Sequence, residues 1–162
     1  MHINLRSTGL KFLGPATLAI FVMGLWVAPT AQAQTEPQPR LPITTLTAGM
    51  HLIKAELAVT SDQQATGMMW RTEMVGNEGM LFVKNDDQIR CFWMKNTLLP
   101  LSIAFLTADG TIINIAEMQA RSEQSHCSTQ PARFALEMRQ GWFAKNGIQP
   151  GFKLRGKPFE GR

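Results

Sequence analysis

The stretch Leu101-Ser-Ile-Ala-Phe-Leu-Thr-Ala-Asp-Gly-Thr-Ile-Ile-Asn-Ile115 holds two apolar runs on either side of the dipeptide Asp109-Gly110. Asp-Gly accepts the positive φ angles of a tight turn, and apolar runs flanking it are the strongest short-range signal of a β-hairpin. The stretch therefore predicts two strands that pair directly with each other.

Further strand signals lie on both sides of this hairpin. Residues 51–60 alternate between apolar and polar side chains, which is the period of a half-buried strand. Short apolar or alternating runs at 79–83, 89–94, 134–138 and 152–154 are also predicted to be strands. Polar turn residues, among them Asn85-Asp86-Asp87, separate several of these runs.

Two segments carry helix signals. Ser61 offers a capping oxygen and Gln64 follows three residues later, so a helix is predicted to begin here, with Gly67 in its middle. One or two helical turns are expected over 141–146, ended by Gly147. The chain is therefore predicted to be mainly β with one or two short helices, arranged as a compact sandwich or barrel.

The first thirty-three residues are set apart from this domain. Arg6 and Lys11 make a positive start, and an uncharged segment with an apolar run over 17–28 ends in Ala31-Gln32-Ala33. The run is shorter than the about twenty residues of a membrane-spanning helix, and the two small alanines suit a signal peptidase. Residues 1–33 are predicted to be a cleaved secretory signal, with an uncleaved N-terminal anchor as the alternative.

The remaining chain is expected to be one exported domain. The total of 162 residues, 44% of them apolar, is enough for a single compact domain. Residues 34–45, with prolines at 37, 39 and 42, are predicted to be a flexible linker, and residues 46–158 a single β-rich domain. The expected location is the periplasm or the outside of the cell, with membrane contact only through an uncleaved signal.

Charge gives little support to nucleic-acid binding. The predicted signal contains two basic residues and no acidic one, so its removal lowers the formal net charge from +4 to +2. Nucleic-acid binding usually needs a clustered basic stripe, and no nucleic-acid partner is expected.

The two cysteines, Cys91 and Cys127, are expected to form a disulfide in an oxidising compartment. Two separate thiols, with Cys91 packed as a small apolar group, are the alternative. A zinc site is not expected from two thiols with His126 close by.

Several short motifs follow one another along the chain. The most specific is Trp-Met-Lys-Asn-Thr at 93–97, and the others are Gly-Met-Met-Trp-Arg at 67–71, Gly-Met-Leu-Phe at 79–82, Leu136-Glu137 and Gly141-Trp142. Together they resemble the motifs of an uncharacterised bacterial and archaeal family, the domain of unknown function 192. The resemblance covers residues 51–154. It implies a compact, mainly β fold of jelly-roll-like type with no agreed activity.

A polar rim is predicted at the end of the apolar strand over 89–94. If Arg71 reaches this rim, its charge and that of Lys95 join the neutral groups of Asn96 and Thr97, which suits a carboxylate or a polar peptide segment. The candidate ligand-binding residues are Arg71, Trp93, Lys95, Asn96, Thr97 and Glu137. The structural alternative is that Arg71 pairs with Glu137, Asn96 shapes a turn and Lys95 is solvated.

Binding of a small polar ligand or a peptide segment, without catalysis, is the function that the sequence favours. The Gly-x-Ser-x-Gly, His-Glu-x-x-His and Cys-x-x-Cys motifs are absent, and no catalytic residue, cofactor or metal ligand is predicted. One alternative is a Cu(I) protein that uses the eight methionines beyond residue 33, with His51. Methionines at apolar positions are more often core filler. Another alternative is an envelope accessory protein that acts through contacts with a partner protein.

Overall fold

The computed structural model describes residues 35–160, and the predicted signal over 1–33 lies outside them. The described part has eight strands, two short α-helices and one turn of 3-10 helix. The predicted class, mainly β with one or two short helices, is thus confirmed. Within residues 35–160 no helix combines the length and hydropathy that crossing a membrane requires.

Six strands form the main sheet. In spatial order they are β1 (Ile43–Ala48), β2 (His51–Ala58), β3 (Glu78–Gln88), β8 (Ala132–Arg139), β5 (Leu101–Leu106) and β6 (Ile112–Met118). Neighbours are antiparallel except β2 and β3, which run parallel. Because β1 and β6 do not pair with each other, the sheet is not closed, and the barrel alternative is wrong.

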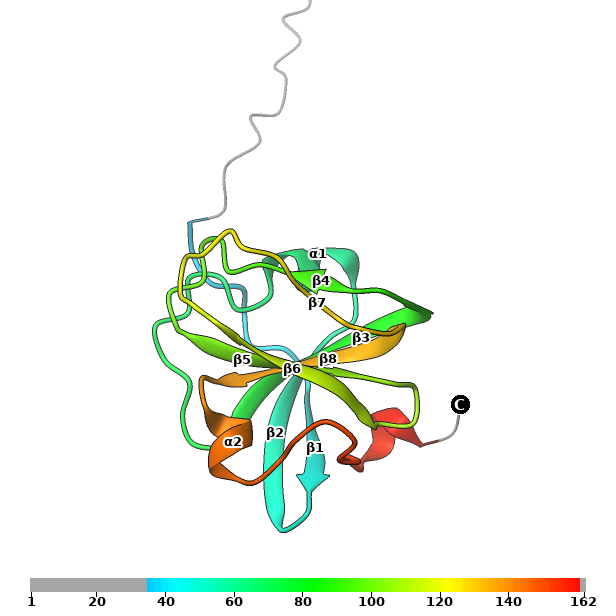
Figure 1. Ribbon diagram of the computed structural model, residues 1–162. Coiled ribbons are helices and arrows are strands. Elements are labelled where there is room, and N and C mark those ends of the chain that lie inside the picture. Colours follow the sequence, from blue (N-terminus) through cyan, green and yellow to red (C-terminus); the bar gives the residue numbers. More distant parts are fainter. Residues whose placement is uncertain (1–34, 161–162) are drawn as a thin grey trace, which may run out of the picture. The chain divides into compact units, whose positions relative to one another are not determined.

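A second layer covers one side of this sheet. Strands β4 (Cys91–Phe92) and β7 (His126–Cys127) form a two-stranded sheet. Figure 1 shows this small sheet and α1 (Ser61–Thr66) on one side of the main sheet, whereas α2 (Trp142–Lys145) lies on the other side. The 3-10 turn η1 (Lys157–Phe159) follows near the C-terminus. The arrangement is compact and sandwich-like.

The predicted hairpin is present. Strands β5 and β6 pair antiparallel from Leu101 with Met118 to Leu106 with Ile112. The connection is wider than the expected two-residue turn, since residues 107–111 lie between the paired ends. Gly110 adopts a φ of 86°, and a Cβ there would lie 2.7 Å from the Leu154 carbonyl oxygen, so the close approach of the C-terminal segment requires glycine.

Helix α1 connects the parallel strands β2 and β3. The Thr60 hydroxyl accepts a hydrogen bond from the Gln63 N–H, and the Gln63 side chain accepts one from the Thr60 N–H. The capping box therefore begins one residue before the predicted Ser61. Gly67 ends the helix with a φ of 49° instead of lying in its middle, and a Cβ there would meet the Phe82 ring at 3.2 Å.

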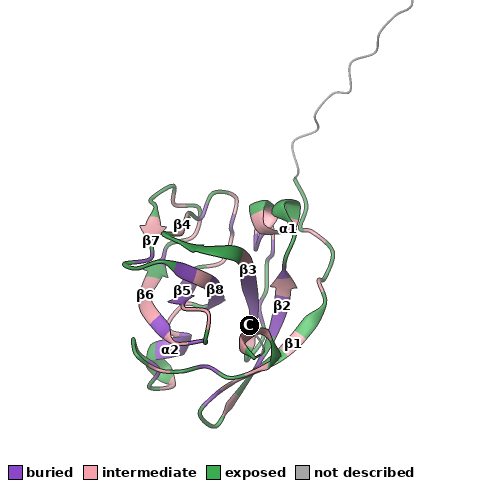
Figure 2. Ribbon diagram, turned by 90° about the vertical axis from the view of Figure 1, so that its right-hand side faces the viewer, coloured by how far each residue is buried: buried purple, intermediate pink, exposed green. Residues whose placement is uncertain are grey.

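The main sheet is buried on both faces. All six residues of β5 are buried, because side chains on one face join one core and those on the other join a second core. The first core includes Ala104, Leu106 and Leu136, and the second includes Ile103 and Phe105. Figure 2 shows the buried residues gathered on β2, β5 and β8.

Several predicted boundaries are wrong. The strand expected over 89–94 is reduced to β4, while β3 continues through Asn85-Asp86-Asp87, which were expected to turn. Arg133 of β8 contacts Asp87 and the Asn85 carbonyl, which holds this extension. Strand β1 begins at Ile43, inside the predicted linker over 34–45. The strand expected over 152–154 is reduced to isolated bridges, one of them between Thr111 and Lys153.

Candidate functional site

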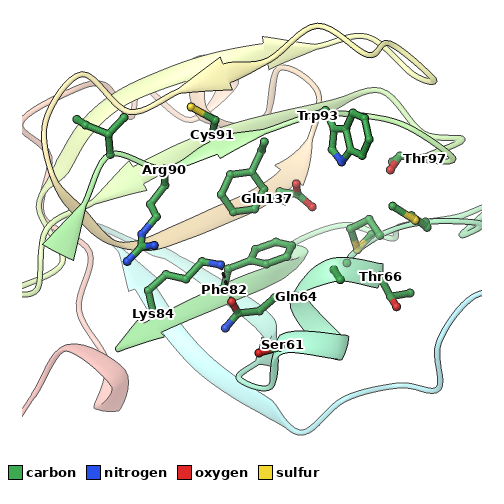
Figure 3. Close-up of a pocket in the computed structure, with 16 residues that line it drawn as sticks. Ser61, Gln64, Thr66, Phe82, Lys84, Arg90, Cys91, Trp93, Thr97 and Glu137 are labelled. Carbon is green, nitrogen blue, oxygen red and sulfur yellow. Dashed lines mark hydrogen bonds between the residues drawn. The ribbon is translucent and has the colours of Figure 1, made fainter. Parts of the chain in front are cut away.

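A cavity of about 490 Å³ lies between α1, the end of β3 and β4. Its lining includes the aromatic rings of Phe82, Phe92 and Trp93 and the charged groups of Lys84, Arg90 and Glu137. In the view of Figure 3, Lys84 and Arg90 lie at one end, Trp93 and Thr97 lie at the other, and Glu137 lies between the two ends. A partly apolar cavity with a few charged groups is the usual form of a small-molecule site.

Glu137 is the buried acidic group of this cavity. It is on the central strand β8, where it pairs in register with Met80 on β3 and Ile103 on β5. Its exposed fraction is 4%, and among the described residues it has no hydrogen-bond or ion-pair partner. Burial between Met80 and Ile103 raises the pKa of Glu137 to about 8, because the charged form loses its hydration.

A second glutamate occupies the same row of the sheet. Glu56 on β2 pairs in register with Met80, which separates it from Glu137 by one strand. The Arg71 guanidinium donates to both carboxylate oxygens of Glu56 at 2.7 and 2.8 Å, and Arg40 and the Leu41 N–H donate at 2.8 Å. Burial alone raises the pKa of Glu56, but these hydrogen bonds outweigh it and hold that pKa below its ordinary value.

The structural alternative that paired Arg71 with Glu137 is therefore wrong. Arg71 is buried, and its charge is taken by Glu56. Arg71 lines a smaller cavity beside Pro37 and Arg40 and does not line the large one. Arg71 therefore supports the sheet through Glu56 and does not share a rim with Lys95. Of the predicted rim, only Trp93 and Thr97 line the large cavity together with Glu137.

The Trp-Met-Lys-Asn-Thr block divides into two groups. Trp93 and Thr97 line the large cavity, and Trp93 remains 47% exposed. Lys95 lies outside the lining, with its ammonium 5.2 Å from the centre of the Trp93 ring. Asn96 shapes a turn, as the structural alternative expected. Its φ is 59°, and its carbonyl accepts a hydrogen bond from the Trp70 N–H at 2.9 Å.

Sequence reasoning missed the cationic end of the cavity. The Gln64 side-chain oxygen accepts a hydrogen bond from the Lys84 ammonium, and the Gln64 amide donates to the Val83 carbonyl at 2.7 Å. Arg90 contacts Asp86, so its charge is offset locally. Strand alternation could have indicated Lys84. If the strand is continued past its apolar run, Met80, Phe82 and Lys84 all lie on one face of β3.

The cysteines form the expected disulfide. Cys91 and Cys127 are directly opposite each other in the small sheet and are bonded, so the alternative of two separate thiols is wrong. Because Cys91 also lines the cavity, the disulfide ties the β4 side of the cavity to β7.

The methionines do not gather around His51. Five of them pack in the second core, and these are Met68, Met74, Met80, Met94 and Met118. His51 packs instead against Trp142 of the first core, with ring centres 6.1 Å apart, and Met50 is 96% exposed. Within residues 35–160 no cluster of three or more His, Cys, Asp and Glu residues could hold a metal ion.

Fold and cavity together define a small sandwich-like β domain with one buried, unpartnered carboxyl. The chain belongs to the DUF192 family, described as uncharacterized ACR, whose family model matches residues 43–156. The resemblance of the sequence motifs to this family is thus confirmed.

Two solved structures are similar to this chain. One is a Novosphingobium aromaticivorans protein of unknown function, which is 38% identical, with a TM-score of 0.65 over 70% of this chain and 83% of that one. The other is a Sinorhizobium meliloti protein proposed to be a transcription regulator, which is 32% identical, with a TM-score of 0.70 over 75% of this chain and 98% of that one. The curated proteins contain no match to the chain.

Proposed function

We propose that this DUF192 domain is an exported binding protein that holds a small ligand, or one side chain of a peptide segment, in the cavity at Glu137 without converting it. The observation that carries the proposal is the Glu137 carboxyl, which is 4% exposed, lines a cavity of about 490 Å³ and has no partner among the described residues.

Burial of this carboxyl opposes folding. A neutral carboxyl without a hydrogen-bond partner costs up to about 1–3 kcal/mol relative to a partnered one, and Glu137 avoids part of that cost because it faces the cavity. An apolar side chain of similar size would pack between Met80 and Ile103 without that cost. A ligand group that hydrogen-bonds to Glu137 would recover the lost energy, so the arrangement suits a site that is completed by its ligand.

The composition of the lining supports binding over turnover. The two described histidines, His51 and His126, both lie outside the cavity lining. Cys91 is held in the disulfide and is not available as a thiolate nucleophile. The hydroxyl groups of the lining, such as Ser61 and Thr97, therefore lack a histidine that could activate them.

Export is supported by two independent features. Residues 1–33 have the charge pattern and small-residue end of a secretory signal. The Cys91–Cys127 disulfide is of the kind that persists in oxidising compartments. The proposed location of the protein is therefore the periplasm or the outside of the cell.

Native mass spectrometry of the protein purified from the envelope of its own cells tests the proposal. We expect a mass that lacks residues 1–33, contains the disulfide and carries one small organic molecule. Glu137→Leu should lose that molecule while unfolding at a higher temperature than the wild type, because an unpartnered polar group is replaced by an apolar one. Glu123→Leu is the matched control, since Glu123 is exposed and outside the cavity lining.

Two results would contradict the proposal. A wild-type protein that carries no ligand would remove its basis, as would a Glu137→Leu protein that keeps the same ligand in the same amount. A retained copper ion in place of an organic molecule would favour the methionine alternative.

A further inference from the structure

We propose that the ligand is an organic acid, with its carboxylate at the Lys84 end of the cavity, its apolar body over Phe82 and a neutral hydrogen-bonding group at Glu137. This inference rests on the proposed binding function and specifies the chemistry of that same site. The carboxylate could belong to a free acid or to the C-terminus of a peptide, because both present the same group.

Lys84 is a cavity cation without a direct ion-pair partner among the described residues, and its ammonium lies 5.9 Å from the centre of the Phe92 ring. Arg90 is paired with Asp86, but within residues 35–160 no carboxylate forms an ion pair with Lys84. Lys84 is half-buried, and its ammonium is positioned by the Gln64 side-chain oxygen. Burial lowers the pKa of Lys84 and the nearby Arg90 lowers it further, whereas the negative charge of Asp86 offsets these effects only in part. A bound anion would relieve both effects, so this end of the cavity favours a negative group.

An apolar surface lies between Lys84 and Glu137 in the cavity. Met80, Phe82 and Lys84 follow one another on the same face of β3, and Met80 is the register partner of Glu137. At about 3.3 Å per residue, the backbone at Lys84 lies about 13 Å along the strand from the level of Glu137. The Phe82 ring occupies the interval and packs edge-to-face on Phe92, with ring centres 4.9 Å apart. An aromatic or aliphatic body fits this surface.

The burial of Glu137 limits the ligand group that can meet it. An amine there would require two charges to be buried among apolar neighbours such as Met80 and Ile103, and burial of an ion pair carries a large desolvation penalty. A hydroxyl, carbonyl or amide can hydrogen-bond to the neutral carboxyl without that penalty. Thr97 lines the same cavity at the Trp93 end, and its hydroxyl has no hydrogen-bond partner among the described residues. The ligand is therefore neutral at this end.

Calorimetry with a matched set of probes tests the ligand class. The ligand-stripped, processed protein is titrated with 3-(4-hydroxyphenyl)propionate, its neutral amide 3-(4-hydroxyphenyl)propionamide and the cation tyramine. We expect the acid to bind at least about tenfold more tightly than either of the others, which corresponds to about 1.4 kcal/mol. 3-Phenylpropionate, which lacks the hydroxyl, should bind less tightly than the hydroxylated acid.

Two pairs of variants locate the two ends. Lys84→Met keeps the length of the side chain but removes its charge, and should abolish the preference for the acid over the amide. Lys95→Met is its matched control, because Lys95 lies outside the cavity lining, and should keep that preference. Glu137→Gln keeps a neutral hydrogen-bonding group and should retain binding within about threefold. Glu137→Leu should bind the acids more weakly and lose the preference for the hydroxylated acid, in line with its expected loss of the retained ligand.

Peptides distinguish the two sources of the carboxylate. A short peptide that ends in Leu-Phe is compared with the same peptide carrying a C-terminal amide. Tighter binding of the free-carboxylate peptide than of the free acids supports the inference and assigns the carboxylate to a chain end. Tighter binding of the small acids supports the inference and assigns it to a free metabolite.

The inference and the proposed function fail in different ways. Tighter binding of tyramine than of the acid would overturn the charge assignment while leaving the binding function intact. A ligand released from the envelope-purified protein that has no acidic group would do the same. Absence of any retained ligand, together with no binding of any probe, would overturn the binding function itself.

Discussion

Glu56 and Glu137 share one row of side chains on the main sheet, yet their surroundings push their pKa values in opposite directions. Glu56 is surrounded by donors, with Arg71 and Arg40 both bonded to it. Glu137 has apolar register neighbours and no partner among the described residues. Two carboxyls of the same type can therefore serve different purposes, and the one without a partner marks the candidate site.

Glu137→Gln tests the protonation of the buried carboxyl. The pKa of Glu137 is raised in the folded protein, so the folded state binds the proton more tightly than the unfolded state does. The stabilisation that comes from this tighter proton binding is complete below the unfolded-state pKa of 4.5 and is lost as the pH rises to about 8. The free energy of unfolding of the wild type should fall relative to that of Glu137→Gln by about 1.4 kcal/mol per pH unit in this window.

Urea denaturation of both proteins across the same pH range measures this difference. Glu123→Gln is the control, because Glu123 is exposed and outside the cavity. A difference between wild type and Glu137→Gln that stays constant with pH would contradict a raised pKa at Glu137.

Arg71→Ala should destabilise the protein strongly. The substitution leaves the buried Glu56 carboxylate without its two-pronged partner, and breaking a buried ion pair from one side costs about 3–5 kcal/mol. Lys95→Ala, which removes an exposed cation, should change the free energy of unfolding by less than about 0.5 kcal/mol. Chemical denaturation compares the two variants, and similar small losses would show that Arg71 is not structural.

At the scale of secondary-structure elements, β3 connects the core to the candidate site. Its first residues, including Met80 and Phe82, are buried, and the strand then continues to Lys84 at the cavity and to the exposed Asp87. Arg133 of β8 holds that exposed end by its ion pair with Asp87. A strand that ended with its apolar run would not extend to Lys84, one of the two cations of the cavity lining.

The start of α1 supports a prediction at the same scale. Thr60→Ala removes the hydroxyl that caps the helix and should lower the free energy of unfolding by about 1 kcal/mol. Ser61→Ala removes a hydroxyl that lies inside the helix, and we expect a loss of less than about 0.5 kcal/mol. Thermal or urea denaturation distinguishes the two, and a larger loss for Ser61→Ala would place the cap one residue later.

At the scale of the whole molecule, the fold buries both faces of one sheet and leaves a cavity under the second layer. The first core packs against α2, while the second lies under α1 and the β4–β7 sheet. The second layer is small, with two residues in each of β4 and β7, so few backbone hydrogen bonds hold it. The Cys91–Cys127 disulfide joins these two strands covalently.

Removal of the disulfide should therefore affect both stability and binding. The bond links residues 36 positions apart, and a loop of this length is expected to contribute about 3–4 kcal/mol through restriction of the unfolded chain. Urea denaturation of Cys91→Ala/Cys127→Ala should show a loss of this size, with weaker retention of the ligand because Cys91 lines the cavity. A loss below about 1 kcal/mol with unchanged retention would contradict this role.

Local pattern was enough to predict the mainly β class, the β5–β6 hairpin and the pairing of the two cysteines. These features depend on residue period, turn chemistry and recurring motifs, all of which lie in short stretches of chain. Of the candidate ligand-binding residues, Trp93, Thr97 and Glu137 line the cavity, and their role in binding stays a prediction. Residue boundaries were less accurate, as β3 and α1 show, because cross-strand contacts and capping geometry extend or shorten an element.

The order of the strands in space settled the questions that local pattern left open. Only Glu137 was expected as a partner for Arg71, whereas the order β2-β3-β8 brings Glu56 to Arg71 and leaves Glu137 facing the cavity. Lys84 became a cavity residue because β3 lies beside β8 and under α1. Such contacts join residues far apart in the chain, and their energies depend on burial and on neighbouring charges that appear after the sheet has assembled.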